Sequence, residues 1–102
     1  MRNATEFQTV YQRGTKKISQ SFVVFVMPNG ADRTRFGLTT PRRLGKAHER
    51  NRIKRRVREI LRTSGDTVPP GLDVVINPRR SVHDRAFEEL RSELLSLLGM
   101  AL

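Results

Sequence analysis

Apolar residues recur with helical spacing in three segments of the chain and form strand-like runs in three others. Between residues 3 and 13, Phe7, Val10 and Tyr11 lie on one face of a predicted helix. Residues 18–27 are rich in β-branched and aromatic side chains, which is typical of a strand. Both faces of this strand are apolar, so we expect both to be covered.

A turn signal follows that strand. Residues 28–32 read Pro-Asn-Gly-Ala-Asp, and residues 34–39 come next with Phe36 and Leu38 at alternating positions. Two apolar runs joined by such residues are typical of a hairpin. We therefore expect residues 18–27 and 34–39 to pair as antiparallel strands.

Residues 46–63 form the longest predicted helix. At about 100° per residue, its apolar positions fall in a stripe about a third of the circumference wide. These positions are Ile53, Val57, Ile60 and Leu61, and Asn51, Arg55, Arg58 and Arg62 lie opposite. The pattern predicts one core face and one cationic face. Arg50 falls on the apolar side, which the helical wheel does not explain.

The last two predicted elements are a strand and a helix. Residues 72–76, LDVVI, predict a strand buried on both faces. The helix begins at residue 83 or 84, ends at residue 98, and has an apolar face of Phe87, Leu90, Leu94, Leu97 and Leu98. The order α-β-β-α-β-α predicts the α+β class, with helices packed on a small sheet. At 102 residues we expect a single domain spanning residues 1–102.

Positive charge is concentrated in the predicted basic helix and the loop before it. Residues 42–62 contain ten Lys or Arg against two acids, which places eight of the ten excess positive charges there. Eight of the ten cations are Arg, whose planar guanidinium pairs with phosphate at two points. A membrane-surface helix would need a broader apolar face. The segment therefore indicates nucleic acid as the partner.

The composition argues against several other classes. The chain has no Cys, so it has no disulfide or thiolate metal site, and a reducing cytoplasm is compatible. The longest apolar run, residues 22–27, is too short to span a membrane, and the N-terminus lacks a signal-peptide core. His48 and His83 lack the spacing of metal ligands, and no Gly-rich phosphate loop is present. We expect a soluble, cytoplasmic protein with no catalytic or metal site of its own.

Several motifs together resemble the protein subunit of bacterial ribonuclease P. The hallmark of that family is an Arg-Asn-Arg helix, which matches residues 47–59, AHERNRIKRRVRE, after the strand at residues 35–38 and the pair Arg42-Arg43. The likeness extends to residues 6–14, EFQTVYQRG, to SFVVF and to LDVVI, so it covers almost the whole chain.

The resemblance implies a fold and a function. The fold would contain a left-handed βαβ crossover carrying the basic helix, as in the second domain of a small-subunit ribosomal protein. The protein would be the non-catalytic subunit of an RNA-based endoribonuclease that removes the 5′ leader of precursor tRNA. By that resemblance the RNA subunit hydrolyses the phosphodiester, with Mg²⁺ bound mainly by the RNA. The partners would be that RNA and the leader, with no membrane and no DNA.

The resemblance also assigns site residues. The expected contacts with the catalytic RNA are Arg50, Asn51, Arg52, Lys54, Arg55, Arg56, Arg58 and Arg62. The expected contacts with the leader are Phe7, Tyr11, Phe25, Arg42, Arg43 and Lys46. Aromatic side chains hold single strands by stacking, without sequence preference. The two aromatics of the first helix are also what a small core needs, so a core role for them stays open.

Two departures from the family pattern matter. Members usually carry several more residues, often basic, before the first helix, so contacts from such an extension are expected to be reduced. Asn77-Pro78 follows LDVVI where many members place Ala and then Lys or Arg. A basic contact at that place is expected to be lost or to have moved to Arg79 and Arg80.

Three other functions fit the sequence less well. A DNA-binding regulator would place the basic helix in a major groove, but it predicts a helix-turn-helix pair and a dimer, and neither is visible. A ribosomal or other structural RNA-binding protein fits the composition and is disfavoured only by the context of the RNRIKR hexamer. An autonomous protein nuclease lacks the necessary carboxylate or His pairs.

Overall fold

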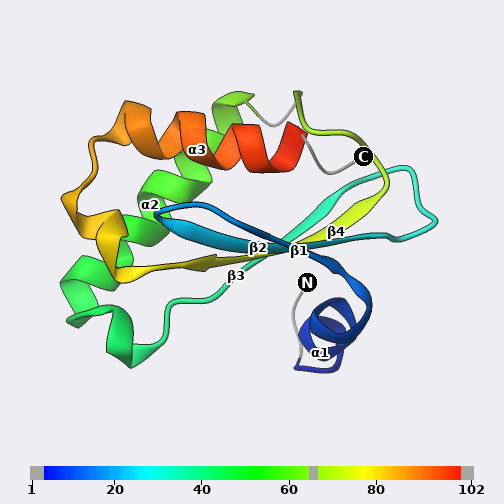
Figure 1. Ribbon diagram of the computed structural model, residues 1–102, viewed down its shortest axis with the longest axis horizontal. Coiled ribbons are helices and arrows are strands. Elements are labelled where there is room, and N and C mark those ends of the chain that lie inside the picture. The colour runs from blue at the N-terminus through cyan, green and yellow to red at the C-terminus, as the bar shows by residue number, and fades with distance from the viewer. Residues whose placement is uncertain (1–3, 65–66, 100–102) are drawn as a thin grey trace.

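A computed structural model describes residues 4–64 and 67–99, and the predicted helix start at residue 3 lies outside them. Within these ranges the chain forms a four-stranded sheet and three α-helices (Figure 1). The α+β class is confirmed. The elements in order are α1 (Ala4–Arg13), β1 (Thr15–Ile18), β2 (Phe22–Pro28), β3 (Arg35–Leu38), α2 (Ala47–Ser64), β4 (Leu72–Pro78) and α3 (Phe87–Gly99), with short 3-10 helices η1 (Arg42–Leu44) and η3 (Arg80–Asp84).

The sheet is mixed, with strand order β1-β2-β4-β3. The strands β1, β2 and β4 pair antiparallel, and β3 pairs parallel to β4. Since α2 connects β3 to β4, the βαβ crossover implied by the resemblance is present. The crossover places the basic helix across one face of the sheet.

The predicted hairpin between residues 18–27 and 34–39 is wrong, because β4 lies between β2 and β3. All residues of the LDVVI run are buried, as predicted, and they gain that burial in the centre of the sheet. The loop after β2 is attached to the start of β4: Asn29 Nδ2 donates to the Leu72 carbonyl at 3.0 Å, and Thr34 Oγ1 accepts from Leu72 N at 3.2 Å. The turn residues were identified correctly, but the strand beside β2 was not.

The predicted strand at residues 18–27 is also wrong at its beginning, because the chain reverses between β1 and β2. Ser19 N donates to the Phe22 carbonyl at 2.8 Å and closes this turn. Glu93 of α3 accepts hydrogen bonds from Ser21 N at 2.8 Å and from Ser21 Oγ at 2.9 Å. Burial acts to raise the pKa of Glu93, but hydrogen bonds from Ser19 and Ser21 hold it below its ordinary value. The turn is thus fixed to α3 by a charged acceptor.

The last helix begins later than predicted. Residues 80–84 form η3, and the extended backbone of Arg85 separates it from α3, which starts at Phe87. Ala86 N donates to Glu89 Oε1 at 2.9 Å, so a carboxylate three residues on satisfies a backbone donor at the start of α3.

The two faces of the sheet are covered unequally (Figure 1). One face packs on α2 and α3, and its buried core includes Phe22, Val24 and Val26 of β2, Ile53, Val57 and Ile60 of α2, and Leu90, Leu94 and Leu98 of α3. The helix α1 lies on the opposite face and buries Val10 there. On that face Val23 and Phe25 stay partly exposed, so the expectation that both faces of this strand are covered is met only in part. None of the helices in the described ranges is long and apolar enough to cross a membrane.

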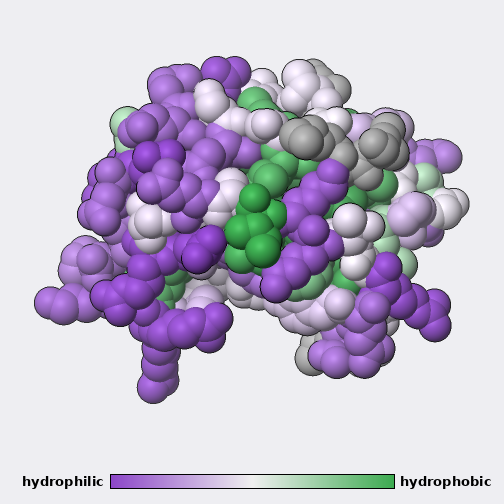
Figure 2. All heavy atoms as spheres, in the orientation of Figure 1, coloured by the Kyte–Doolittle hydropathy of each residue, from purple (hydrophilic) through white to green (hydrophobic). Residues whose placement is uncertain are grey.

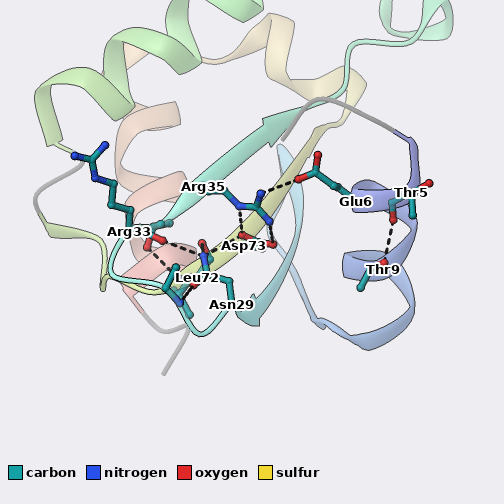
Figure 3. A network of polar contacts seen from close by, with 10 residues as sticks. Thr5, Glu6, Thr9, Asn29, Arg33, Arg35, Leu72 and Asp73 are labelled. Atoms are coloured by element: carbon teal, nitrogen blue, oxygen red, sulfur yellow. Dashed lines mark hydrogen bonds and ion pairs between the residues drawn. The ribbon is translucent and has the colours of Figure 1, made fainter.

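A polar network joins α1 to the sheet (Figure 3). Arg35 donates to both carboxylate oxygens of Asp73, at 2.8 and 2.6 Å, and also pairs with Glu6 of α1 at 2.8 Å. Asn29 Nδ2 adds a hydrogen bond to Asp73 at 3.0 Å. The hydrogen bonds from Arg35 are the largest cause of a lowered pKa for the buried Asp73 carboxyl. The network holds α1 beside the open part of the sheet.

Candidate nucleic-acid interface

The basic helix α2 has separate core and solvent faces, as its periodicity predicted. Before it, Gly45 adopts a φ of 146°, and Lys46 N donates to Glu49 Oε1 at 2.8 Å at the first turn. This bond is the main cause of a lowered pKa for Glu49. Figure 2 shows hydrophilic side chains gathered at the left of the view, where η1 and the first turns of α2 lie. The exposed residues among the predicted RNA contacts are Asn51, Arg52, Arg55, Arg58 and Arg62.

The structure explains why Arg50 falls on the apolar side of the helical wheel. It is partly buried in the first turn of α2, and its Nη1 donates to the Thr40 carbonyl at 3.5 Å. Its Nε atom is buried and has no hydrogen-bond partner among the described residues. The side chain therefore lies against the segment that leaves β3.

The remaining predicted RNA contacts of α2 differ in how far they are buried and in whether they contact other protein groups. Arg56 is partly buried and donates to the Arg85 carbonyl at 3.2 Å, and burial is the main cause of its lowered pKa. Arg62 pairs with Glu59 at 2.6 Å, which raises the pKa of Arg62 and lowers that of Glu59. Lys54 is partly buried. The exposed Asn51, Arg52, Arg55 and Arg58 are thus the predicted contacts most open to an incoming phosphate.

A hollow of about 490 Å³ opens on the face of the sheet that α1 leaves uncovered. Its lining includes the apolar side chains Val23, Phe25, Pro41, Leu44 and Pro78. The remaining lining residues are Asn77 and the cations Lys16, Arg43, Arg79 and Arg80. An apolar surface among four cations fits a nucleotide chain, because bases stack on apolar surfaces and phosphates pair with cations.

A second hollow of about 410 Å³ adjoins the first, and the two share Pro41, Arg43 and Asn77. Tyr11, Thr39 and Thr40 complete its lining. We call the two hollows together the cleft.

Two aromatic rings connect α1 to the cleft. The rings of Tyr11 and Phe25 meet edge to face, with centroids 4.9 Å apart and planes at 82°. Lys16 Nζ lies 5.9 Å from the centroid of the Phe25 ring, within the range of a cation–π contact. Because Tyr11 comes from α1 and Phe25 from β2, the docking of α1 shapes this part of the cleft.

The structure brings only some of the predicted leader contacts together. Tyr11, Phe25 and Arg43 line the cleft. Phe7 lies elsewhere, in a hollow between α1, β3 and α2 that Lys54 and Arg58 also line. Arg42 and Lys46 are exposed but do not line the cleft.

The cleft residues that the sequence reasoning missed include Lys16, Val23, Thr39 and Asn77. Val23 shares a strand face with Phe25, so alternation along β2 was a usable signal. Asn77 is opposite Val23 in the ladder between β2 and β4, a pairing that the sequence reasoning did not find. Arg79 and Arg80, to which the sequence reasoning had moved a basic contact, both line the cleft.

Among the described residues, neither His nor the carboxylates form an evident reaction centre. His83 Nε2 hydrogen-bonds the Leu44 carbonyl, and His48 is exposed on α2. Asp73 and Glu93 are occupied by the hydrogen bonds described above. Within the described ranges no group of three or more His, Asp or Glu is placed to hold a metal ion. The chemistry that this surface offers is binding through stacking, hydrogen bonds and positive charge.

Comparisons with known proteins point to one family. A family model described as Ribonuclease P matches residues 1–102. The ribonuclease P protein component of Thermotoga petrophila is 37% identical, over 96% of this chain and 87% of that protein. That of Finegoldia magna is 38% identical, over 99% and 88%. The solved structure of the RNase P protein from Thermotoga maritima has a TM-score of 0.91 and 35% identity, covering 97% of this chain and 94% of that one.

Proposed function

The chain belongs to the ribonuclease P protein family, and from that premise we propose that it binds two RNA segments on two surfaces. As a ribonuclease P protein component it is a subunit of an RNA-based tRNA-processing enzyme, and its partner is the RNA subunit. The solvent face of α2 binds that catalytic RNA. The cleft binds the 5′ leader of precursor tRNA and so promotes endonucleolytic removal of the leader.

The observation that carries the proposal is the cleft itself. Tyr11 and Phe25 offer aromatic surfaces beside Lys16 and Arg43, on the sheet face that α2 and α3 do not cover. A stacked base contributes roughly 1–3 kcal/mol without regard to its identity. A leader whose sequence varies among precursors can therefore be held by stacking and phosphate pairing.

The exposed face of α2 suits a folded RNA. Its Arg side chains project from one continuous helix, so their backbone positions are regularly spaced and their guanidinium groups can pair with several phosphates of one RNA. Arg50 contacts the Thr40 carbonyl, and Thr40 lines the cleft. Bound catalytic RNA and bound leader would therefore lie close together, as cleavage at the end of the leader requires.

Mg²⁺ is proposed to act on the RNA and not on the protein. The ion prefers oxygen ligands in octahedral geometry, often carboxylates and phosphates. The buried carboxylate of Asp73 and the partly buried carboxylate of Glu93 already accept hydrogen bonds from protein groups. Mg²⁺ held by the RNA subunit would supply an activated water and stabilise the leaving oxygen. The protein residues bind, orient and offset phosphate repulsion.

Reconstitution tests this function. Cleavage of precursor tRNA by a bacterial ribonuclease P RNA is measured at low Mg²⁺, with and without the protein. We expect a clear stimulation, because the cations of α2 and the cleft replace screening that Mg²⁺ otherwise supplies. Unchanged cleavage at every protein concentration would contradict the proposed function.

A further inference from the structure

Asn77 occupies the middle of the cleft. It lines both hollows and is partly buried. Its backbone is fixed in β4, opposite Val23 of β2. A base that stacks on Phe25 or Tyr11 would therefore lie next to the side-chain amide of Asn77.

Two hydroxyl groups set the orientation of that amide. Thr39 Oγ1 donates to Asn77 Oδ1 at 2.6 Å, and Tyr11 Oη donates to the same oxygen at 3.2 Å. An amide oxygen has two lone pairs, so both are used. No described residue accepts a hydrogen bond from Asn77 Nδ2. The amide thus offers the cleft two N–H donors and no acceptor.

A donor-only amide distinguishes bases by their exocyclic groups. Asparagine pairs with adenine by using its oxygen and its NH₂ together, and here the oxygen is occupied. Uracil and guanine carry a carbonyl oxygen at the ring position where cytosine and adenine carry an amino group. Where the amide NH₂ meets this exocyclic group, it gains a hydrogen bond from the carbonyl of a keto base and faces an unpaired donor in an amino base.

We propose that Asn77 selects a keto base, uracil or guanine, at one position of the leader. The inference rests on the proposed leader binding and adds a preference to it. Stacking on Tyr11 and Phe25 accepts any base, so the selectivity comes from the amide. One hydrogen bond gained or lost corresponds to a preference of roughly three- to tenfold.

The test uses precursor tRNAs with a randomised leader. The complex of catalytic RNA and protein cleaves the pool in competition, and relative kcat/KM is read for each base at each leader position. The same pool cleaved by the RNA alone at high Mg²⁺ supplies the preferences that belong to the RNA. We expect a protein-dependent enrichment of uracil and guanine, roughly three- to tenfold, at one position.

Two variants connect that preference to the amide. Asn77→Ala should reduce the enrichment to the level of the RNA alone. Thr39→Val frees one lone pair of Asn77 Oδ1, so adenine should gain at the same position, a change of identity that loss of folding cannot imitate. Ser92→Ala, on an exposed part of α3, is the control and should keep the wild-type preference.

The outcomes separate the two proposals. Strong stimulation with equal use of all four bases would overturn the role of Asn77 and leave leader binding standing. A preference that survives unchanged in Asn77→Ala would also overturn it. No stimulation by the wild-type protein would overturn both, since base selection presupposes a bound leader.

Discussion

At the scale of single residues, the aromatic side chains of the cleft offer stacking surfaces and its polar side chains offer hydrogen bonds. Tyr11 contributes twice, because its ring meets Phe25 and its hydroxyl group donates to Asn77. The family resemblance assigned Tyr11 to the leader cleft, and its contact partners come from β2 and β4. Phe7, four residues earlier on α1, was chosen by the same argument and lies in a different hollow. Helical spacing identified the face of α1 but not what each residue meets.

Replacing Tyr11 by alanine tests the stacking surface. We expect Tyr11→Ala to weaken binding of precursor tRNA to the RNA–protein complex by about 1–3 kcal/mol, the value of one stacked base, and to leave mature tRNA unaffected. Equilibrium binding of both tRNAs measures this. Phe7→Ala is the matched comparison, from one turn earlier on α1. Equal losses for precursor and mature tRNA in Tyr11→Ala would assign Tyr11 to the core.

Replacing Asp73 by asparagine tests the network that holds α1. Arg35 keeps the folded-state pKa of Asp73 below its ordinary value of 3.8. A lowered folded pKa contributes stability that is present above the ordinary pKa and is lost as pH falls through the folded pKa. We expect Asp73→Asn to lower the free energy of unfolding by about 1–3 kcal/mol at neutral pH.

The pH dependence supplies the control for that prediction. Urea unfolding from pH 7 to pH 2 should show the wild-type protein losing its advantage over Asp73→Asn as the solution becomes acid, because protonated Asp73 no longer pairs with Arg35. A difference between the two proteins that stays constant over this range would show that ionisation of Asp73 does not stabilise the fold.

At the scale of elements, α2 is the part that the sequence described best. Its period of apolar residues and its charges are local properties, and the helix found at Ala47–Ser64 differs from the predicted range by one residue at each end. Its RNA face can be tested by replacing one exposed cation. We expect Arg55→Ala to weaken binding to the catalytic RNA and to reduce the slope of log K against log salt by roughly one.

Arg91→Ala is a suitable control for Arg55, because Arg91 lies on α3 and its guanidinium contacts Ser64 and Glu88. Its salt slope should equal that of the wild-type protein. An unchanged slope in Arg55→Ala would show that Arg55 meets no phosphate.

Replacing Gly45 by alanine tests the junction between η1 and α2. Gly45 has a φ of 146°, and a Cβ atom there would lie 2.9 Å from Glu49 Oε1, the carboxylate that accepts from Lys46 N. We expect Gly45→Ala to cost about 1–3 kcal/mol of unfolding free energy, because the backbone is strained and the start of α2 loses its acceptor. Thermal unfolding measures the loss. A melting temperature equal to that of the wild-type protein would contradict this reasoning.

For the strands, the sequence predicted burial but not strand order. The run LDVVI was correctly predicted to be buried on both faces, because a continuous apolar run is a local signal. Its position between β2 and β3 depends on pairing between residues about fifty positions apart, which no local pattern encodes. Asn77 enters the cleft only through that pairing. Periodicity therefore predicted the core face of α2, whereas cleft residues placed by strand register, such as Asn77, were missed.

At the scale of the whole molecule, the unequal covering of the sheet makes two RNA surfaces possible. Two helices cover one face and form the core, while α1 covers only part of the other (Figure 1). In the function that we propose, the net charge of +10 attracts both RNAs over long distances, and the cleft and the face of α2 then distinguish them. The protein is thus expected to add to the affinity for the leader specifically, not only to that for RNA in general.

One measurement tests this claim most directly. Dissociation constants of precursor tRNA and mature tRNA are determined with the catalytic RNA alone and with the RNA–protein complex, at one Mg²⁺ concentration. We predict that the protein tightens precursor binding about tenfold or more beyond any effect on mature tRNA, the equivalent of one or two stacked bases. An equal change for both tRNAs would contradict leader binding in the cleft.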